Sequence, residues 1–179
     1  MLAQTKVFPK VLSFNQAKYY IFSLVFIGLS VLTPAIFHQF NLVGAKFLPM
    51  HIFVILAGLL FGWRAGLLVG VLSPLMSYGL THMPALTILP EIVLELGVYG
   101  LIAGTLMEKK LNIWISLLSA MVLGRLARLL FVLFSGLETN PSDYFIIGWP
   151  GVVLQLVLIP IVVYLLQKFF FKKNNEKTV

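Results

Sequence analysis

Residues 113–134 read IWISLLSAMVLGRLARLLFVLF, an apolar run whose charged side chains are Arg125 and Arg128. About 20 consecutive apolar residues are enough for a helix to cross a bilayer. A charged side chain at that depth costs roughly 2.5–3.5 kcal/mol on insertion scales, so it persists where a partner, a cavity or a ligand compensates it. The run therefore predicts a membrane helix that carries a functional position.

The composition extends this prediction to the whole chain of 179 residues. Hydrophobic residues make up 60% of the chain and charged residues 11%, and the mean hydropathy is +1.00. A soluble domain of this size does not bury so much apolar surface in one core. We therefore expect an all-α integral membrane protein with a single domain over residues 1–179. The absence of cysteine excludes disulfides, thiolate metal sites and cysteine nucleophiles.

Apolar segments separated by short polar or Pro/Gly breaks predict the number of membrane crossings. We expect six transmembrane helices, at about residues 19–38, 47–61, 65–80, 90–107, 112–134 and 144–171. The second and third segments are short for a hydrocarbon layer of about 30 Å, and a tight turn at residues 62–64 joins them.

The basic residues predict the orientation of these crossings. Lysine and arginine precede the first segment, occupy the turn between the second and third, follow the fourth and close the chain, whereas the opposite loops hold only Lys46. Cytoplasmic loops carry such an excess, so we expect both termini in the cytoplasm. The net charge of +7 then reflects topology, and nucleic acid is not an expected partner because the chain has no motif that binds it.

With this orientation, polar side chains gather in the outer half of the membrane. Glu91 and Glu95 are four residues apart and share one helix face, as do Arg125 and Arg128, which are three apart. Other candidates assigned to the same zone are His51, Tyr78, Trp149 and Gln155. A substrate-binding pocket open to the outside is the simplest interpretation.

These candidates also have structural interpretations, which the sequence leaves open. The arginines and glutamates would form an ion-pair network between helices, which is compatible with a pocket. His51 would be a satisfied histidine at the membrane interface. Trp149 would belong to an aromatic belt at the membrane surface.

Glycines form a second pattern, because they recur every four residues along the second and third segments. Small residues at this spacing let helix backbones approach closely in lipid. We expect close packing within the chain and keep partner docking as the alternative. The candidates are Gly28 on the first segment, and Gly58, Gly62, Gly66 and Gly70.

Three stretches carry a family resemblance. Residues 47–62 (FLPMHIFVILAGLLFG), 65–74 (AGLLVGVLSP) and 95–104 (ELGVYGLIAG) resemble the S components of energy-coupling factor (ECF) vitamin transporters, which are their substrate-binding membrane subunits. The chain length, the six expected spans with a short second and third, and the cytoplasmic termini agree with that family. The resemblance extends over essentially the whole chain.

The resemblance implies a subunit without ATPase activity or a cofactor that captures a vitamin or related micronutrient from outside a prokaryotic-type plasma membrane. It implies a transmembrane coupling protein and two ABC ATPase subunits as partners, which drive import. In such proteins the ligand lies near the outer side, enclosed by the first loop and helices four to six. The implied pocket candidates are Glu91, Glu95, Arg125, Arg128, Trp149 and Gln155, with His51 beside the first loop. The first segment lacks the Ala-x-x-x-Ala docking motif that members often carry, so the sequence does not identify the docking face.

The charged residues limit the chemical class of the expected ligand. Arginine favours a carboxylate or an electron-rich heterocycle, whereas glutamate favours amino or ring N–H donors. Both together predict a polar ligand such as a pterin, a pyrimidine, a purine-like base or an amino-acid-like vitamin.

Two other function classes compete with this one. An intramembrane hydrolase would need a metal or nucleophile motif, and the chain has neither His-Glu-x-x-His nor Gly-x-Ser-x-Gly. We therefore expect no metal site and no catalytic residue. An autonomous small-solute transporter would need a polar path on both sides, whereas the inner halves of the segments hold few polar groups and no inverted repeat is visible.

Overall fold

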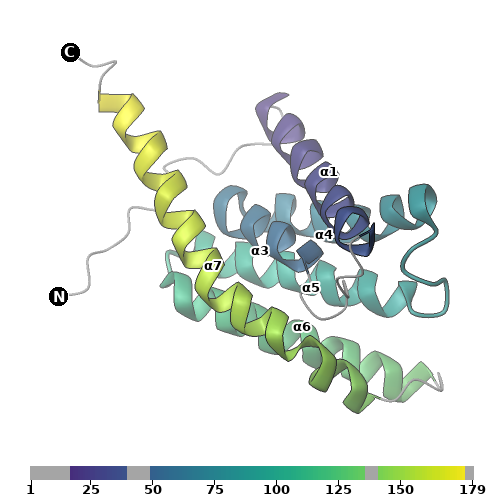
Figure 1. The fold of residues 1–179 in the computed structure, drawn as a ribbon. Helices are drawn as coiled ribbons and strands as arrows, with labels where there is room; N and C mark the ends of the chain where they lie inside the picture. The colour runs from purple at the N-terminus through teal and green to yellow at the C-terminus, as the bar shows by residue number, and fades with distance from the viewer. Residues whose placement is uncertain (1–16, 40–48, 136–140, 176–179) are drawn as a thin grey trace.

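The computed structural model of the protein describes residues 17–39, 49–135 and 141–175, and all regular structure in these ranges is helical (Figure 1). The helices are α1 (Ala17–Gln39), α3 (Pro49–Phe61), α4 (Trp63–Thr81), α5 (Leu89–Glu108), α6 (Ile113–Ser135) and α7 (Pro141–Asn175). The predicted all-α fold class is thus confirmed for the described part of the chain.

Two local features of the sequence set helix boundaries. Gly62 separates α3 from α4 with a φ of 90°, a left-handed backbone conformation that glycine adopts without steric cost. The turn is tight, because the N–H of Gly62 donates to the carbonyl of Gly58 at 2.9 Å and the N–H of Gly66 donates to the carbonyl of Gly62 at 3.0 Å. Pro90 lies in the first turn of α5, where its missing N–H leaves no helical hydrogen bond unmade.

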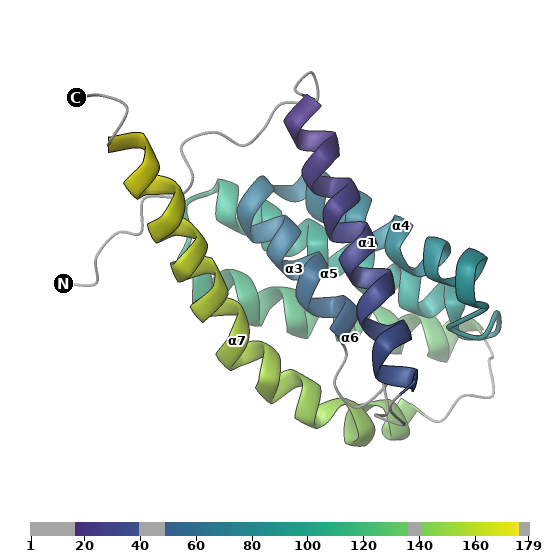
Figure 2. The ribbon, with the colours of Figure 1, turned by 45° about the horizontal axis from the view of Figure 1, so that its top comes forward.

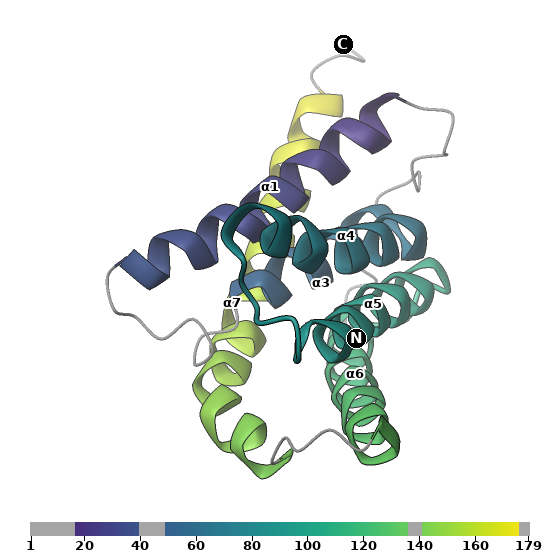
Figure 3. The same ribbon diagram turned by 90° about the vertical axis from the view of Figure 1, so that its right-hand side faces the viewer.

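Helix α5 lies at the centre of the structure. It packs against α3, α4 and α6, while α1 packs on α3 and α4 (Figure 2). The view in Figure 3 places α1 and α6 on opposite sides of the α3–α5 group. Helix α7 runs along the assembly and contacts α3 and α6. Side chains on the inward faces of α5 are therefore surrounded by helices on several sides.

Close glycine contacts hold α5 against α3 and α4. A Cβ atom added at Gly66 would overlap the backbone of Gly100, and one at Gly70 would overlap the backbone of Leu96. A Cβ at Gly58 would lie 2.7 Å from the carbonyl oxygen of Gly100. These three glycines thus make close backbone contacts within the chain. At Gly28 on α1, by contrast, an added Cβ would meet no atom within 4 Å.

Among the described residues, three helices are long and apolar enough to cross a membrane: Leu89–Glu108, Ile113–Ser135 and the part of α7 from Gly148 to Leu166. The described parts of α1 and α3 include shorter apolar helices, Tyr20–Pro34 and Pro49–Phe61. The protein therefore has the helices of a membrane protein, whereas six crossings and cytoplasmic termini stay predictions. Residues 40–48, which include the predicted start of the second span, lie outside the described residues.

Candidate functional site

The site begins on one stripe of α5. Glu91, Glu95 and Tyr99 follow each other at intervals of four residues, so they share a helix face. Because α5 is the central helix, this face is buried inside the protein: Glu91 is 0% exposed, Glu95 1% and Tyr99 1%. Two carboxylates are thus buried among apolar helices, where ionised groups require compensation.

Arg128 on α6 provides that compensation for both carboxylates. Its Nη1 donates to Oε2 of Glu95 at 2.9 Å, and its Nη2 donates to Oε1 of Glu91 at 3.0 Å. These are charge-assisted hydrogen bonds of good length, which are about twice as strong as neutral ones. One guanidinium therefore joins the two glutamates and ties α6 to α5.

Gly124 explains how α6 comes close enough for this arrangement. A Cβ atom added at Gly124 would overlap the ring of Tyr99 and lie 3.1 Å from the backbone oxygen of Glu95. Gly124 is one turn before Arg128 and therefore on the same face of α6. The missing side chain lets the backbone of α6 rest on the Tyr99 ring and brings Arg128 within reach of the carboxylates.

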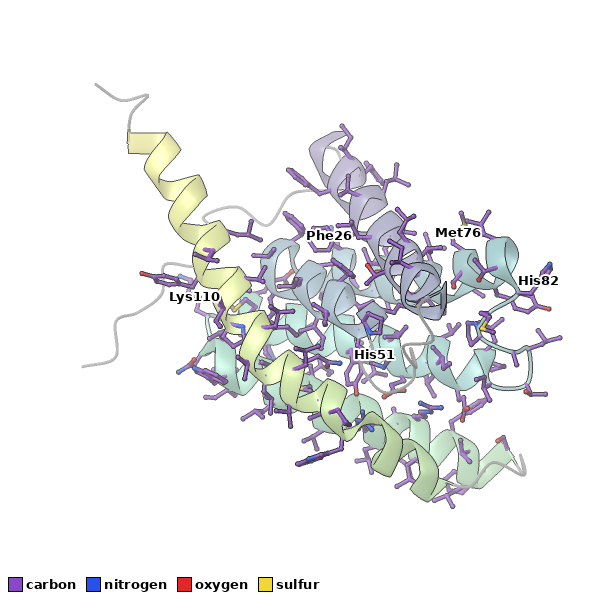
Figure 4. All side chains as sticks on the ribbon, in the orientation of Figure 1. Phe26, His51, Met76, His82 and Lys110 are labelled. Atoms are coloured by element: carbon purple, nitrogen blue, oxygen red, sulfur yellow. The ribbon has the colours of Figure 1, made fainter. Side chains whose placement is uncertain are left out.

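Tyr99 and His51 complete the cluster around Glu95. The Tyr99 hydroxyl donates to Oε1 of Glu95 at 3.0 Å. His51, in the first turn of α3, has its Nε2 3.7 Å from the same oxygen, which is ion-pair range but too long for a hydrogen bond. The His51 ring also meets the Tyr99 ring edge-on, with centroids 5.2 Å apart. Figure 4 shows His51 among the helices, and it is 5% exposed.

Hydrogen bonding is unevenly distributed over these groups. Both oxygens of Glu95 have donors, from Tyr99 and Arg128. Within the described part of the chain, Oε2 of Glu91 and both ring nitrogens of His51 are buried without a hydrogen-bond partner. A buried polar atom left in that state costs about 1–3 kcal/mol. At these three atoms an added hydrogen-bonding group would stabilise the site.

Arg125 lies next to this cluster as a second positive charge. It interacts electrostatically with both Glu95 and Tyr99, and it is partly exposed. The sequence predicted two charged faces, and the structure brings them together through Arg128, with Arg125 alongside. The ion-pair network that was one interpretation of the sequence is thus present. We call Glu91, Glu95, Arg125, Arg128, His51 and Tyr99 the charged cluster.

The remaining predicted site residues are Gln155, Tyr78 and Trp149. Gln155 is buried on α7, the helix that contacts α3 and α6. Tyr78 packs edge-on against His82, with ring centroids 6.0 Å apart, and Trp149 is 65% exposed on α7. Within the described residues, neither Tyr78 nor Trp149 makes a hydrogen bond or ion pair with the charged cluster. Their part in substrate binding stays a prediction.

Sequence reasoning missed two members of this arrangement. Tyr99 stands in an apolar context, although its spacing of four from Glu95 was a usable signal. Gly124 is one of many glycines, and only the packing of α6 on α5 reveals its role. In the part of the chain that the structure describes, no three His, Asp or Glu side chains are grouped to hold a metal ion.

The comparison with known proteins adds one match. The family model described as "ECF transporter, substrate-specific component" matches residues 18–139, which is 122 of the 179 residues. This range includes every member of the charged cluster. Neither the curated proteins nor the solved structures gave a match.

Proposed function

The chain belongs to the family of ECF transporter substrate-specific components, and on that premise we propose that it captures a vitamin or related micronutrient from outside the cell for ATP-driven import. Members of this family are membrane subunits that bind a small-molecule substrate and work with other ECF components; they are not enzymes themselves. The proposal assigns the plasma membrane of a prokaryotic-type cell as the location.

One observation supports a binding site most directly. Arg128 joins Glu91 and Glu95 inside a group of apolar helices, with His51 beside them. Ionisable residues in membrane helices are costly and usually mark a substrate or ion site. We propose that the charged cluster lines the substrate pocket and that Gln155, Trp149 and Tyr78 contribute from the neighbouring helices.

The distribution of charge along α5 supports an outward-facing site. Glu91 and Glu95 lie in its first two turns, whereas Glu108 lies at its other end and accepts a hydrogen bond from the backbone N–H of Trp63 at 3.1 Å. Arg64 follows Trp63 in the chain, and Lys109 and Lys110 follow Glu108, so basic residues adjoin this contact at the far end of α5. Basic residues favour the cytoplasmic side, so the charged cluster would lie toward the outside.

We further propose the topology and partners that follow from this orientation. Six helices would cross the membrane as a single domain with both termini in the cytoplasm. A transmembrane coupling protein and two ABC ATPase subunits would supply the energy, since the chain itself would only bind. Gly28 on α1 stays a candidate for partner docking, because its surroundings within the chain leave space.

Native mass spectrometry of the detergent-purified protein tests this proposal. Gentle release should yield a stoichiometric compound of vitamin size from the wild-type protein, and co-expression with an ECF coupling module should give ATP-dependent uptake of that compound. A protein that carries no such compound, and whose melting temperature does not respond to a panel of vitamins, would contradict the proposed function. Uptake without any coupling module would favour an autonomous transporter instead.

A further inference from the structure

The hydrogen bonds of the charged cluster limit which groups a ligand can present. Glu95 accepts from Tyr99 on one oxygen and from Arg128 on the other, and His51 faces the first of these oxygens at 3.7 Å. Further donors would have to share an oxygen that is already bonded. Glu95 is therefore a residue that positions Arg128, Tyr99 and His51 around it.

Arg128 is the group that would ordinarily receive a carboxylate ligand. Its planar guanidinium matches a carboxylate with two parallel hydrogen bonds. Here its two terminal nitrogens each donate to a different glutamate, at 2.9 and 3.0 Å. A ligand carboxylate would have to displace one of these bonds and would then lie beside two buried carboxylates of like charge.

Glu91 is placed differently. Its Oε1 is held by Arg128, its Oε2 is buried without a hydrogen-bond partner among the described residues, and the side chain as a whole is 0% exposed. A carboxylate oxygen only accepts hydrogen bonds. The group that would satisfy Glu91 Oε2 is therefore an N–H or O–H donor. His51, also buried, adds two ring nitrogens without a hydrogen bond.

The formal charges of the cluster also bear on the ligand. The formal charges of two glutamates and two arginines sum to zero. This count includes Arg125, which interacts electrostatically with Glu95. Adding an anion would leave a buried net negative charge, whereas adding a neutral donor would not. Buried charges without a partner are strongly unfavourable.

From these contacts we infer that the ligand is anchored by an N–H group that it donates to Glu91, and not by a carboxylate of its own. This inference rests on the proposed function and adds a substrate class to it. The ligand is a nitrogen heterocycle with an amino, amide or ring N–H group, and it is neutral where it meets the cluster. Within the range that the sequence allowed, this favours pterin-, pyrimidine- and purine-like compounds over ligands held by a carboxylate.

Matched pairs of probes test the inference on the purified full-length protein. Each pair has one member with N–H donors and a second in which a carboxylate is present: nicotinamide and nicotinate, uracil and orotate, pterin and pterin-6-carboxylate. Affinity is measured by titration in native mass spectrometry and by the shift in melting temperature. We expect at least one donor member to bind about tenfold or more tightly than its acid partner, the ratio expected from one charge-assisted hydrogen bond.

The outcomes separate this inference from the proposed function. If the acid members bind as tightly as the donor members or more tightly, the inference is wrong while the function stands. If no probe of either class binds, and the protein also carries no compound from its host, both are wrong. Preference for the donor members supports both.

The variant Glu91→Gln adds a second test, with Glu108→Gln as the matched control at the other end of the same helix. Glutamine keeps the size of the side chain but removes the charge of the acceptor. We expect Glu91→Gln to weaken binding of nicotinamide about tenfold while nicotinate, which has no N–H group, binds no more weakly, and Glu108→Gln to leave both unchanged. An equal loss for nicotinamide and nicotinate in Glu91→Gln would mean that the side chain only supports the site, which would overturn direct contact.

Discussion

Gly124 of α6 lies directly against the ring of Tyr99 of α5, at a separation that leaves no space for a Cβ atom. The same ring donates its hydroxyl hydrogen to Glu95 and meets the edge of His51. Gly124 is also one turn from Arg128. The contact between these two residues therefore sets the distance at which the arginine of one helix meets the carboxylates of another.

Replacing Gly124 by alanine should push α6 away from α5. The added methyl group would overlap the Tyr99 ring, and inserting volume into a packed interior costs about 1–3 kcal/mol. We expect Gly124→Ala to lower the melting temperature and to weaken ligand binding, because the bonds from Arg128 lengthen. Gly79→Ala is the control, since a Cβ at Gly79 meets no atom within 4 Å. Equal melting temperatures for Gly124→Ala and the wild type would contradict the packing.

Removing either side of the central ion pair should abolish ligand capture. Arg128→Ala leaves two buried carboxylates without their main counter-charge. Glu95→Ala leaves Arg128 with Glu91 alone. Breaking a buried ion pair costs about 3–5 kcal/mol. We expect both variants to insert into the membrane but to purify without bound compound. Membrane extraction and native mass spectrometry measure the two properties. Wild-type affinity in both variants would refute the assignment of the charged cluster to the pocket.

Tyr99→Phe removes only the hydroxyl group that donates to Glu95. The ring stays, so the contacts with Gly124 and His51 are kept. A hydrogen bond to a charged group contributes about 1.5–3 kcal/mol, and we expect a loss of stability of that order together with weaker binding, because one donor no longer fixes Glu95. Thermal unfolding and ligand titration of the variant check this. A variant as stable as the wild type would show that the hydroxyl bond contributes nothing net.

A bulky residue at Gly66 should disturb helix packing more than it disturbs ligand contacts. Its Cβ would overlap the backbone of Gly100, which side-chain rotation does not relieve. We expect Gly66→Leu to reduce stability or ATP-driven uptake, while any folded protein keeps its affinity. Gly28→Leu is the matched control for stability, because an added Cβ there meets nothing within 4 Å. Normal stability and normal uptake in Gly66→Leu would contradict this prediction.

Much of this arrangement follows from simple rules of spacing and burial. The spacing of Glu91 and Glu95 placed them on one helix face, and the cost of charge in an apolar run made an ion-pair network with the arginines one of two open interpretations. The all-α membrane fold class followed from composition. The close approach of helices at Gly58, Gly66 and Gly70 was also within reach, because small residues every four positions have that effect in lipid.

Other parts depend on how the helices are rotated against each other. Arg125 and Arg128 are equivalent in the sequence, and only the orientation of α6 makes Arg128 the residue that bonds both glutamates. Tyr99 and Gly124 stand in apolar runs, so nothing in their type marks them as neighbours of a charge. The surroundings of Trp149, which is 65% exposed, could not be read from its type either, because a tryptophan fits both a pocket wall and an aromatic belt.

The glycine contacts between α4 and α5 also have a mechanical consequence. Where backbone rests on backbone, as at Gly66 and Gly100, no layer of side chains is present to slide or to change rotamer. We therefore expect α4 and α5 to move together as one rigid unit, which includes the carboxylates of α5. When a ligand enters or leaves, we expect the displacement to fall on α7, which packs mainly on α3 and α6 and not on this pair.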